Sequence, residues 1–595
     1  MARSSDAIGL SIGLAALTAV GIATLRLMLP AWSGTGHALL ALVGAVATCW
    51  VLLWLARRSV AVGISAAGLI LALVLALGAR SLRGQIVERV TQIDRSAGID
   101  LASAVDPAAT GQPGRSTNLV LIVLDTVRAD HLSTYGYPRP TSPFFSQLAE
   151  QGVLYERAIS PAPWTLPAHA SLFTGLPPSQ HGATSEHKRL DDDAVTLGEL
   201  LHDAGYETLG LTSNSSASSA HNLHQGFERF YEVFRPDPSV GARAIRRGLP
   251  GPLARTLARS LPARPADKGA SEVNRLVSHW LDERSERGET RPFFLFANLL
   301  EAHLPYDPPE AFRERFGRGP PPASLKGLLG RHWFRALFGR IGRGDVFTAD
   351  EQRALADRYD AAIAYQDEQL AELIALLDAR FDAEDLAIVV TSDHGENLGE
   401  HGLADHVFSV HQTLLHVPLL VRYPLQFPAG VRIESLVSTA SIYATLLELA
   451  GLPTTEGERG RPAEPLPRVA GAEAVPFVVS EEHLRMQELA TLVAEAPGAH
   501  AGPWLTRFLA VQDQHRKVVQ VGDREPVVFD LDLDPGELKP LPLESREDAR
   551  SLAAVLEKRR LEAHATREGA VGNLDDATRE SLEALGYLDD SPPGG

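Results

Sequence analysis

The stretch Asn118-Leu-Val-Leu-Ile-Val-Leu-Asp125 decides the fold class of this chain. Its apolar residues run without interruption and end at a single carboxylate. Such a run is typical of a parallel strand buried on both faces, whereas a strand with one wet face alternates polar and apolar residues. Similar runs recur at residues 208–212, 293–299, 386–390 and 417–421.

Amphipathic stretches at 196–204 and 357–377 lie between these runs and have helical spacing. Strands that alternate with helices indicate an α/β fold with a mainly parallel sheet between helices. The pattern changes near residue 476, where 508–521 and 526–531 predict short strands of a small antiparallel α+β subdomain. We therefore expect a catalytic domain at 117–475, followed by a C-terminal subdomain and helical tail at 476–595.

The first 83 residues have a different composition. Three apolar runs, at 9–28, 37–56 and 60–79, each have about the length needed to cross a bilayer, whereas a cleaved signal peptide has one short run. Arg57 and Arg58 between the second and third runs favour a cytoplasmic N-terminus, although Arg80 and Arg83 count against it. We expect three transmembrane helices at 1–83, a linker at 84–116, and an extracytoplasmic catalytic domain.

Charge and cysteine content exclude several functions. The net charge of −18 opposes nucleic-acid binding, which needs a basic face. Cys49 is the single cysteine, so disulfides, cysteine-based zinc sites and a thiol mechanism in the soluble part are excluded.

Two inserts, 235–270 and 312–345, differ from the acidic remainder of the chain, because each carries eight Lys or Arg residues and two acidic residues. They are either lids that face anionic headgroups or substrate, or variable surface loops.

Polar residues follow four of the predicted strands where each strand ends. They are Asp125, Asn214, His303, and the pair Asp393 and His394. Ligands in open α/β sheets bind at the carboxyl ends of the strands, so these side chains are expected to converge. Two carboxylates and an imidazole suit a divalent cation such as zinc, manganese or calcium. A second ion has candidate ligands in Asp405, His406 and His411, which lie close together in the sequence.

The segment Pro163-Trp-Thr-Leu-Pro-Ala-His-Ala-Ser-Leu-Phe-Thr-Gly175 contains the expected nucleophile. Pro167 suits the first turn of a helix and Gly175 its end, which places Thr165 at the helix N-terminus, where free N–H groups favour an anion. Coordination to a cation would lower the pKa of the Thr165 hydroxyl. Without the Asp and His cluster, Thr165 would be a simple helix cap.

These motifs together resemble the sulfatase family of the alkaline phosphatase superfamily. The resemblance covers 118–130, 163–175, 303–306 and 391–402 in the family's order, within about 118–455. It implies Asp125, Asp393 and His394 as metal ligands and Thr165 as nucleophile and ligand. It also implies that His303 and His406 contact the charged oxygens or the leaving group of the substrate.

The departures from the sulfatase pattern are equally informative. Thr165 occupies the position of the cysteine or serine that becomes formylglycine, and threonine cannot yield that aldehyde. His169 takes the place of the motif's arginine and is a candidate substrate contact, while Thr126 replaces the second acid of the opening pair. The sulfate-gripping element is replaced by Leu211-Thr-Ser-Asn214. The site thereby resembles threonine-dependent phosphotransferases and nucleotide pyrophosphatases, in which Asn214 would contact the transferred group.

We therefore expect a membrane-anchored hydrolase or transferase that cleaves phosphate or sulfate esters by double displacement, with one divalent metal ion. The ester is expected to belong to a lipid-linked compound or a glycan, and membrane lipids are the other expected partner. Two alternatives stay open: a sulfatase that works without formylglycine, and an inactive membrane protein with a sulfatase fold, whose signature would be lost metal ligands.

Overall fold

The computed structural model describes residues 117–233, 267–329, 345–406, 408–454, 460, 462–472, 475–483 and 506–565, with five further positions between 333 and 340. The three predicted membrane spans, the linker, most of the first basic insert and the end of the helical tail lie outside these residues. Among the residues described, no helix has both the length and the apolar character that crossing a bilayer requires.

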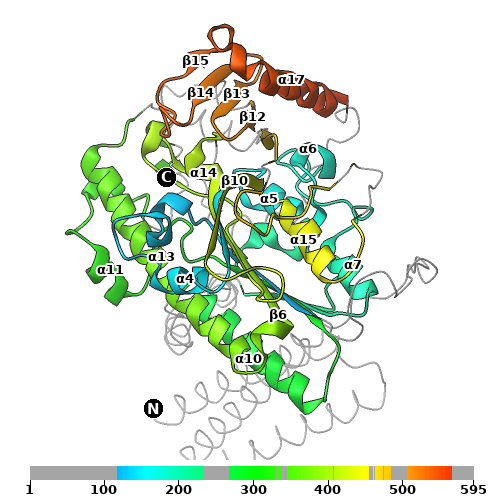
Figure 1. Cartoon of the computed structure of the whole chain (residues 1–595). Helices are drawn as coiled ribbons and strands as arrows, with labels where there is room; N and C mark the ends of the chain where they lie inside the picture. Colours follow the sequence, from blue (N-terminus) through cyan, green and yellow to red (C-terminus); the bar gives the residue numbers. More distant parts are fainter. Residues whose placement is uncertain are drawn as a thin grey trace, which may run out of the picture. The chain divides into compact units, whose positions relative to one another are not determined.

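An eight-stranded sheet forms the centre of the molecule (Figure 1). Its strand order is β10-β2-β9-β6-β1-β5-β3-β4. In sequence order the strands are β1 (Asn118–Leu124), β2 (Val153–Ile159), β3 (Glu207–Thr212), β4 (Arg229–Glu232), β5 (Phe293–Leu299), β6 (Leu386–Thr391), β9 (His416–Arg422) and β10 (Val431–Ser438).

The sheet is mainly parallel, as predicted. β1 lies between β5 and β6 and is parallel to both, and β3 continues the parallel arrangement beside β5. β9 is the exception, because it runs antiparallel to β6 and to β2. The sequence of β9 did not predict its direction, since a strand buried on both faces has the same apolar composition in either orientation.

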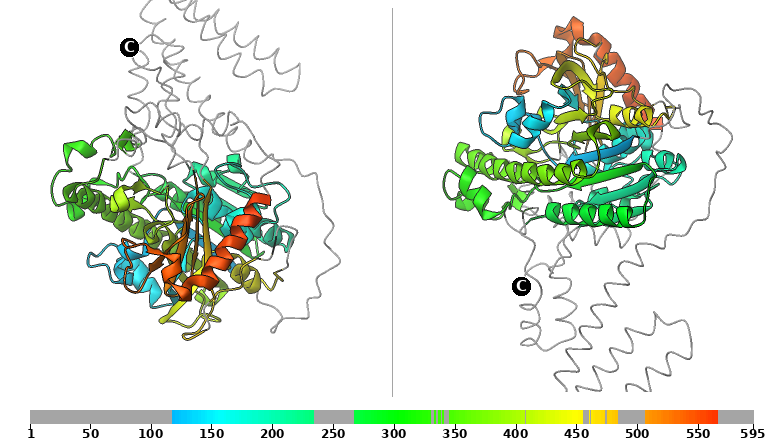
Figure 2. Two further views of the ribbon diagram at one scale, coloured as in Figure 1. Left: turned by 90° about the horizontal axis from the view of Figure 1, so that it is seen from above. Right: turned by 60° about the horizontal axis from the view of Figure 1, so that its bottom comes forward.

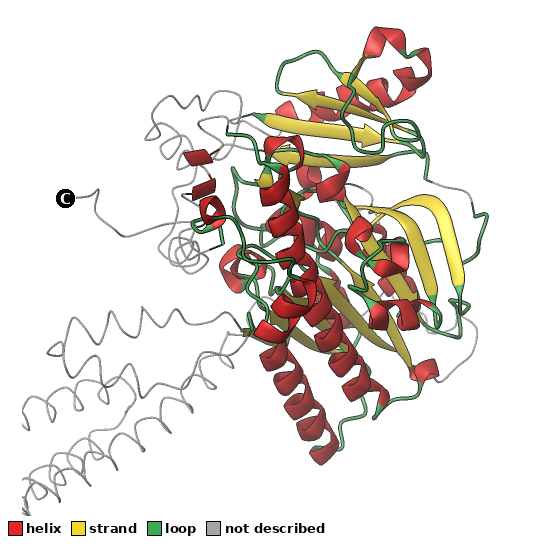
Figure 3. Cartoon of the chain, turned by 90° about the vertical axis from the view of Figure 1, so that its left-hand side faces the viewer, coloured by secondary structure: helices red, strands yellow, loops and turns green. Residues whose placement is uncertain are grey.

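Helices cover both faces of the sheet and bury alternate residues of each strand (Figures 2 and 3). Val120, Ile122 and Leu124 of β1 enter one core, whereas Leu119, Leu121 and Val123 enter the other. The helices of the first face are α4 (Pro143–Ala149), α10 (Ala270–Glu286) and α13 (Ala349–Asp378). Those of the second face are α5 (Thr165–Thr174), α7 (Leu197–Asp203) and α15 (Ser441–Leu449).

A second sheet of five antiparallel strands forms the C-terminal region, as expected. The stretch predicted at 508–521 contains two strands, because Asp513 accepts hydrogen bonds from the backbone N–H groups of His515 and Arg516 and so closes a turn. The strands are β11 (Val478–His483), β12 (Arg507–Gln512), β13 (Arg516–Val521), β14 (Val527–Asp530) and β15 (Leu541–Pro542), with α17 (Arg550–Ala565) packed against them. The predicted domain boundary near 475 stays a prediction.

Capping boxes determine where the two predicted helices begin. Thr196 and Glu199 exchange hydrogen bonds at the start of α7, where the helix was expected. The same exchange between Thr348 and Glu351 starts α13 earlier than predicted, just after the second basic insert. The remaining short elements are α6 (Pro178–His181), α11 (Glu310–Phe316), β7 (Asn397–Leu398), β8 (Ala404–Asp405) and α14 (Gln412–Leu415).

Candidate active site

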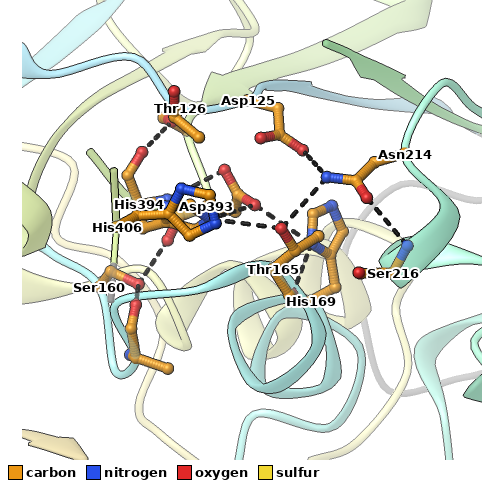
Figure 4. A network of polar contacts seen from close by, with 12 residues as sticks. Asp125, Thr126, Ser160, Thr165, His169, Asn214, Ser216, Asp393, His394 and His406 are labelled. Carbon is orange, nitrogen blue, oxygen red and sulfur yellow. Dashed lines mark hydrogen bonds and ion pairs between the residues drawn. The ribbon is translucent and has the colours of Figure 1, made fainter. Parts of the chain in front are cut away.

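The carboxyl ends of β1, β3 and β6 bring the predicted polar residues together (Figure 4). Asp125 directly follows β1, Asn214 follows β3, and Asp393 and His394 follow β6. All four side chains are almost completely buried. The convergence results from the sheet itself, since neighbouring parallel strands end at one edge.

Thr165 reaches this edge from the first residue of α5. Its hydroxyl oxygen accepts a hydrogen bond from the Asn214 amide at 3.1 Å and lies 3.4 Å from Nε2 of His394. The helix ends at Gly175, whose φ of 71° is the left-handed conformation that glycine adopts without strain. The predicted nucleophile therefore lies beside the predicted ligands, at the end of a helix where unpaired N–H groups favour an anion.

The donor atoms of this site fit a divalent cation. Oδ1 of Asp125 and Oδ2 of Asp393 are buried and have no hydrogen-bond partner among the described residues. Nδ1 of His394 lies 2.9 Å from the carbonyl oxygen of Gly395, to which it donates, so Nε2 is the nitrogen directed toward the site. Together, Asp125, Asp393 and His394 form a buried group with metal-ligand spacing.

The spacing of these atoms supports coordination rather than hydrogen bonding. Nε2 of His394 lies 3.2 Å from Oδ2 of Asp393 and 3.4 Å from the Thr165 hydroxyl. Tetrahedral coordination with bonds of about 2.0 to 2.1 Å places neighbouring ligand atoms about 3.3 Å apart. The Asp393 and Thr165 atoms therefore have the separation from His394 that one coordination sphere requires, and the Asp125 atom lies within 4.8 Å of the Asp393 and His394 atoms.

The electrostatics of the site also favour a cation. Burial, followed by repulsion from Asp393, raises the pKa of Asp125 to about 7. Two carboxylates this close are costly when both are charged and no cation balances them. A bound divalent ion would replace the proton and relieve the repulsion, because metal ligands bind in their deprotonated form.

Two asparagines hold Asp125. The amide nitrogens of Asn214 and Asn298 both donate to Oδ2 of Asp125, at 2.7 and 3.1 Å. The Asn214 carbonyl accepts from the backbone N–H of Ser216, which fixes the amide so that its NH₂ group faces Asp125 and Thr165. The sequence analysis did not predict a role for Asn298. An amide near the end of the otherwise apolar strand β5 was the feature that could have indicated one.

His169 lies one helical turn beyond Thr165 and is fully buried. Its Nδ1 lies 2.9 Å from the backbone oxygen of Thr165, and its Nε2 lies 3.5 Å from the amide nitrogen of Asn298. Burial lowers the pKa of His169, which favours a neutral ring. Both ring nitrogens have protein neighbours, so a substrate contact by His169 stays a prediction.

A second group of titratable side chains lies beside the first. The rings of His303 and His406 are 4.9 Å apart between centroids, and the His406 ring is 4.4 Å from that of His394. Nδ1 of His406 lies 2.6 Å from Oδ1 of Asp405 and 3.2 Å from Oε1 of Glu396. The structure thus brings both predicted leaving-group histidines next to the metal ligands.

The structure differs from the sequence analysis on the composition of this second group. Glu396 belongs to it but was not predicted, whereas His411 does not belong to it. The His411 ring instead stacks on the His401 ring, with the centroids 3.7 Å apart. Nδ1 of His411 lies 3.4 Å from Oε2 of Glu537 in the C-terminal region. Its separation from His406 results from the fold of the connecting loop, which sequence proximity does not reveal.

Comparisons with known proteins agree with this geometry. Arylsulfatase K of Xenopus laevis is 25% identical over 425 residues, which are 67% of this chain and 73% of that protein. Steryl-sulfatase of Mus musculus is 28% identical over 62% of this chain and 68% of its own length.

Solved structures show the same fold. Phosphonate monoester hydrolase of Agrobacterium radiobacter matches with a TM-score of 0.55 at 22% identity, over 76% of this chain and 96% of that protein. A 2-O GAG sulfatase matches with a TM-score of 0.56 at 17% identity, over 80% and 97% of the two chains. The family model described as Sulfatase matches residues 117–452. The chain is therefore an ester-hydrolysing enzyme that belongs to the sulfatase family, within the alkaline phosphatase superfamily.

Proposed function

We propose that Thr165 attacks a phosphate or sulfate ester and forms a covalent intermediate at a site that holds one divalent cation. The observation that carries this proposal is the position of the Thr165 hydroxyl, 3.1 Å from the Asn214 amide nitrogen and 3.4 Å from Nε2 of His394. Asp125, Asp393 and His394 would hold the ion, with Thr165 as a further ligand. Zinc, manganese and calcium all remain compatible with these oxygen and nitrogen donors.

A bound divalent ion would supply Lewis-acid chemistry, which lowers the pKa of a hydroxyl and neutralises charge on the ester oxygens. The chain's own groups orient the reactants. The Asn214 amide faces the Thr165 oxygen and offers a hydrogen bond to the transferred group. The N-terminus of α5 stabilises negative charge that develops on the non-bridging oxygens.

The two histidines beside the site differ in the proton each can offer. Nδ1 of His303 lies 2.5 Å from the carbonyl oxygen of Leu304, to which it donates, so Nε2 is left as an acceptor. Burial, followed by repulsion from His406, lowers the pKa of His303 to about 3. We assign proton donation to His406, whereas His303 would accept a hydrogen bond or proton. Water or an alcohol then attacks the modified Thr165, giving a hydrolase or a transferase.

Phosphate esters are the preferred substrates, because threonine cannot form the aldehyde of formylglycine. Thr126, which occupies the position of a second acidic ligand, donates its hydroxyl to Glu396 and to the Ala302 carbonyl. The relatives named arylsulfatase K and steryl-sulfatase favour the alternative, a sulfatase that works without formylglycine. The buried donor set opposes a catalytically inactive protein.

The sequence supports two further parts of the proposal. The apolar runs at 9–28, 37–56 and 60–79 would anchor the enzyme in the membrane, and Arg57 and Arg58 favour an extracytoplasmic catalytic domain. The substrate would then be an ester presented on the outer side, on a lipid-linked compound or a glycan, with membrane lipids as neighbours.

Intact mass spectrometry with slow aryl phosphate, phosphodiester and sulfate esters tests this function. We expect an adduct on Thr165 whose mass identifies the transferred group, and no adduct in the Thr165→Val variant. Thr174→Val is the matched control, since it removes another buried hydroxyl from α5, which donates to the Ala170 carbonyl and accepts from the Leu176 N–H. An adduct at another residue, or full turnover by Thr165→Val, contradicts the proposal. Faster sulfate turnover would favour the sulfatase alternative.

A further inference from the structure

The second titratable group has a geometry of its own. Glu396, Asp405 and His406 are buried, and both carboxylates face one nitrogen of the imidazole, Nδ1. Oδ2 of Asp405 is buried and has no hydrogen-bond partner among the described residues. The group could therefore be a second cation site or a hydrogen-bonded support for His406.

Donor spacing separates these two explanations. Nδ1 of His406 lies 2.6 Å from Oδ1 of Asp405, a charge-assisted hydrogen-bond distance. Two ligands of one zinc-sized ion would be about 3.3 Å apart, as they are around His394. The short contact favours a hydrogen bond between His406 and Asp405, with Glu396 as a second acceptor at a longer distance.

Two residues of the loop that carries His406 have left-handed backbone conformations. Asp405 has a φ of 70°, in the left-handed region that glycine adopts more readily than other residues. Phe408, in the same loop, has a φ of 69°, which is a clear outlier for a bulky side chain. Strained residues persist where the surroundings hold them, and they gather at functional sites.

The surroundings do hold this loop. Asp405 of β8 pairs with Asn397 of β7, directly after Glu396. From the C-terminal sheet, Lys517 donates to the Val410 carbonyl, and Glu537 accepts from the Gln412 N–H. The loop is therefore fixed on both sides of His406, and the ring orientation depends on the two carboxylates.

We propose that Asp405, together with Glu396, is a positioning residue that holds His406 with Nε2 directed at the leaving group. This inference rests on the proposed function. Nδ1–H is donated to Asp405, so Nε2–H is the group left for the substrate. As the bond between the transferred phosphorus or sulfur and the leaving oxygen breaks, its electron pair stays on that oxygen, which takes the Nε2 proton.

Glu396 connects this support to the metal-binding edge. Its Oε2 accepts from the hydroxyl of Thr126, the residue after the predicted ligand Asp125. Oδ1 of Asp405 and Oε1 of Glu396 both face Nδ1 of His406, at 2.6 and 3.2 Å. The two carboxylates can thus fix the ring and balance its charge when His406 carries protons on both nitrogens.

Leaving-group dependence provides the test, because a proton donor matters most when the leaving oxygen is basic. Wild type, Asp405→Asn, His406→Gln and the double variant are assayed on a 4-nitrophenyl ester and an alkyl ester of the same group. We expect Asp405→Asn to lower kcat/KM about 100-fold on the alkyl ester and less than about tenfold on the nitrophenyl ester. The double variant should be no slower than His406→Gln, since Asp405 acts through His406.

Asp405→Gly is the control for folding, because it removes the carboxylate and relieves the backbone strain at once. We expect Asp405→Gly to keep a cooperative unfolding transition and the wild-type far-UV circular dichroism spectrum, while its alkyl-ester rate falls as in Asp405→Asn. Equal losses on both esters, or a double variant slower than His406→Gln, would overturn the inference. A second equivalent of metal in wild type that Asp405→Asn loses would also overturn it. A wild-type protein without turnover on any ester would instead overturn the proposed function, and this inference with it.

Discussion

The two groups of titratable residues differ in how they are built. The predicted metal-binding group lies at the ends of parallel strands, whereas Glu396, Asp405 and His406 lie in the connection between β6 and α14. Strand ends are positioned by the hydrogen-bond register of the sheet, such as Leu124 opposite Leu299 between β1 and β5. The loop is positioned by contacts with a C-terminal sheet that begins at Val478. One group is therefore local to the sheet, and the other depends on the whole fold.

Metal removal is expected to have the largest effect and to act on the strand-end group alone. A chelator should abolish turnover and lower the thermal midpoint, because an ion at about 100 times its dissociation constant stabilises the folded state by about 2.7 kcal/mol. Turnover assays and thermal unfolding, with and without chelator, measure both effects.

Asp125→Asn is the matched variant for this experiment. It should lack turnover, and the chelator should no longer change its thermal midpoint, because the ion has lost a ligand. A midpoint that the chelator lowers equally in both proteins would show that the stabilising ion is bound elsewhere.

The C-terminal support of the loop should give the next largest effect. Nζ of Lys517 lies 2.8 Å from Oε1 of Glu537, and both side chains are buried. Lys517→Met removes the nearest cation from the buried Glu537 carboxylate and leaves it His411 and the Gln412 N–H. Because removing one partner of a buried ion pair typically costs about 3 to 5 kcal/mol of unfolding free energy, we expect a loss at the lower end of that range. Denaturant unfolding of Lys517→Met and of the Lys517→Met/Glu537→Gln double variant measures the pair, and the double variant should recover part of the loss.

Acid unfolding checks the same pair. Burial raises the pKa of Glu537, but Lys517 and His411 outweigh it and lower the pKa to about 2. Because the folded pKa is depressed, this stabilisation is present above the ordinary value near 4.5 and is lost as the pH falls toward 2. Lys517→Met should show less acid sensitivity in this range; an unchanged acid profile would show that other groups control it.

The same contrast explains what the sequence could predict. The apolar runs at 118–124 and 386–390 predict β1 and β6, and the residues that follow these strands, Asp125, Asp393 and His394, are the ones that the structure brings together. Nothing in the local sequence showed that Glu396 would face His406 or that His411 would turn toward Glu537. Those placements depend on left-handed residues and on contacts between segments far apart in the chain.

Asn298 marks the limit of the strand-end rule and should give the smallest of these effects. It lies within β5 rather than beyond it, so a search for residues after strands missed it. Its amide donates to Asp125 at 3.1 Å, whereas Asn214 donates to both Asp125 and Thr165. Hydrogen bonds to charged groups contribute about 1.5 to 3 kcal/mol. Asn298→Ala should therefore weaken metal affinity about tenfold to 100-fold, while kcat at saturating metal changes little.

Asn214→Ala is the comparison, and it should lower kcat even when metal is saturating, because it also removes the contact to the attacking oxygen. Metal titrations of turnover separate the two outcomes: equal losses of kcat in both variants would mean that both amides act through Asp125 alone.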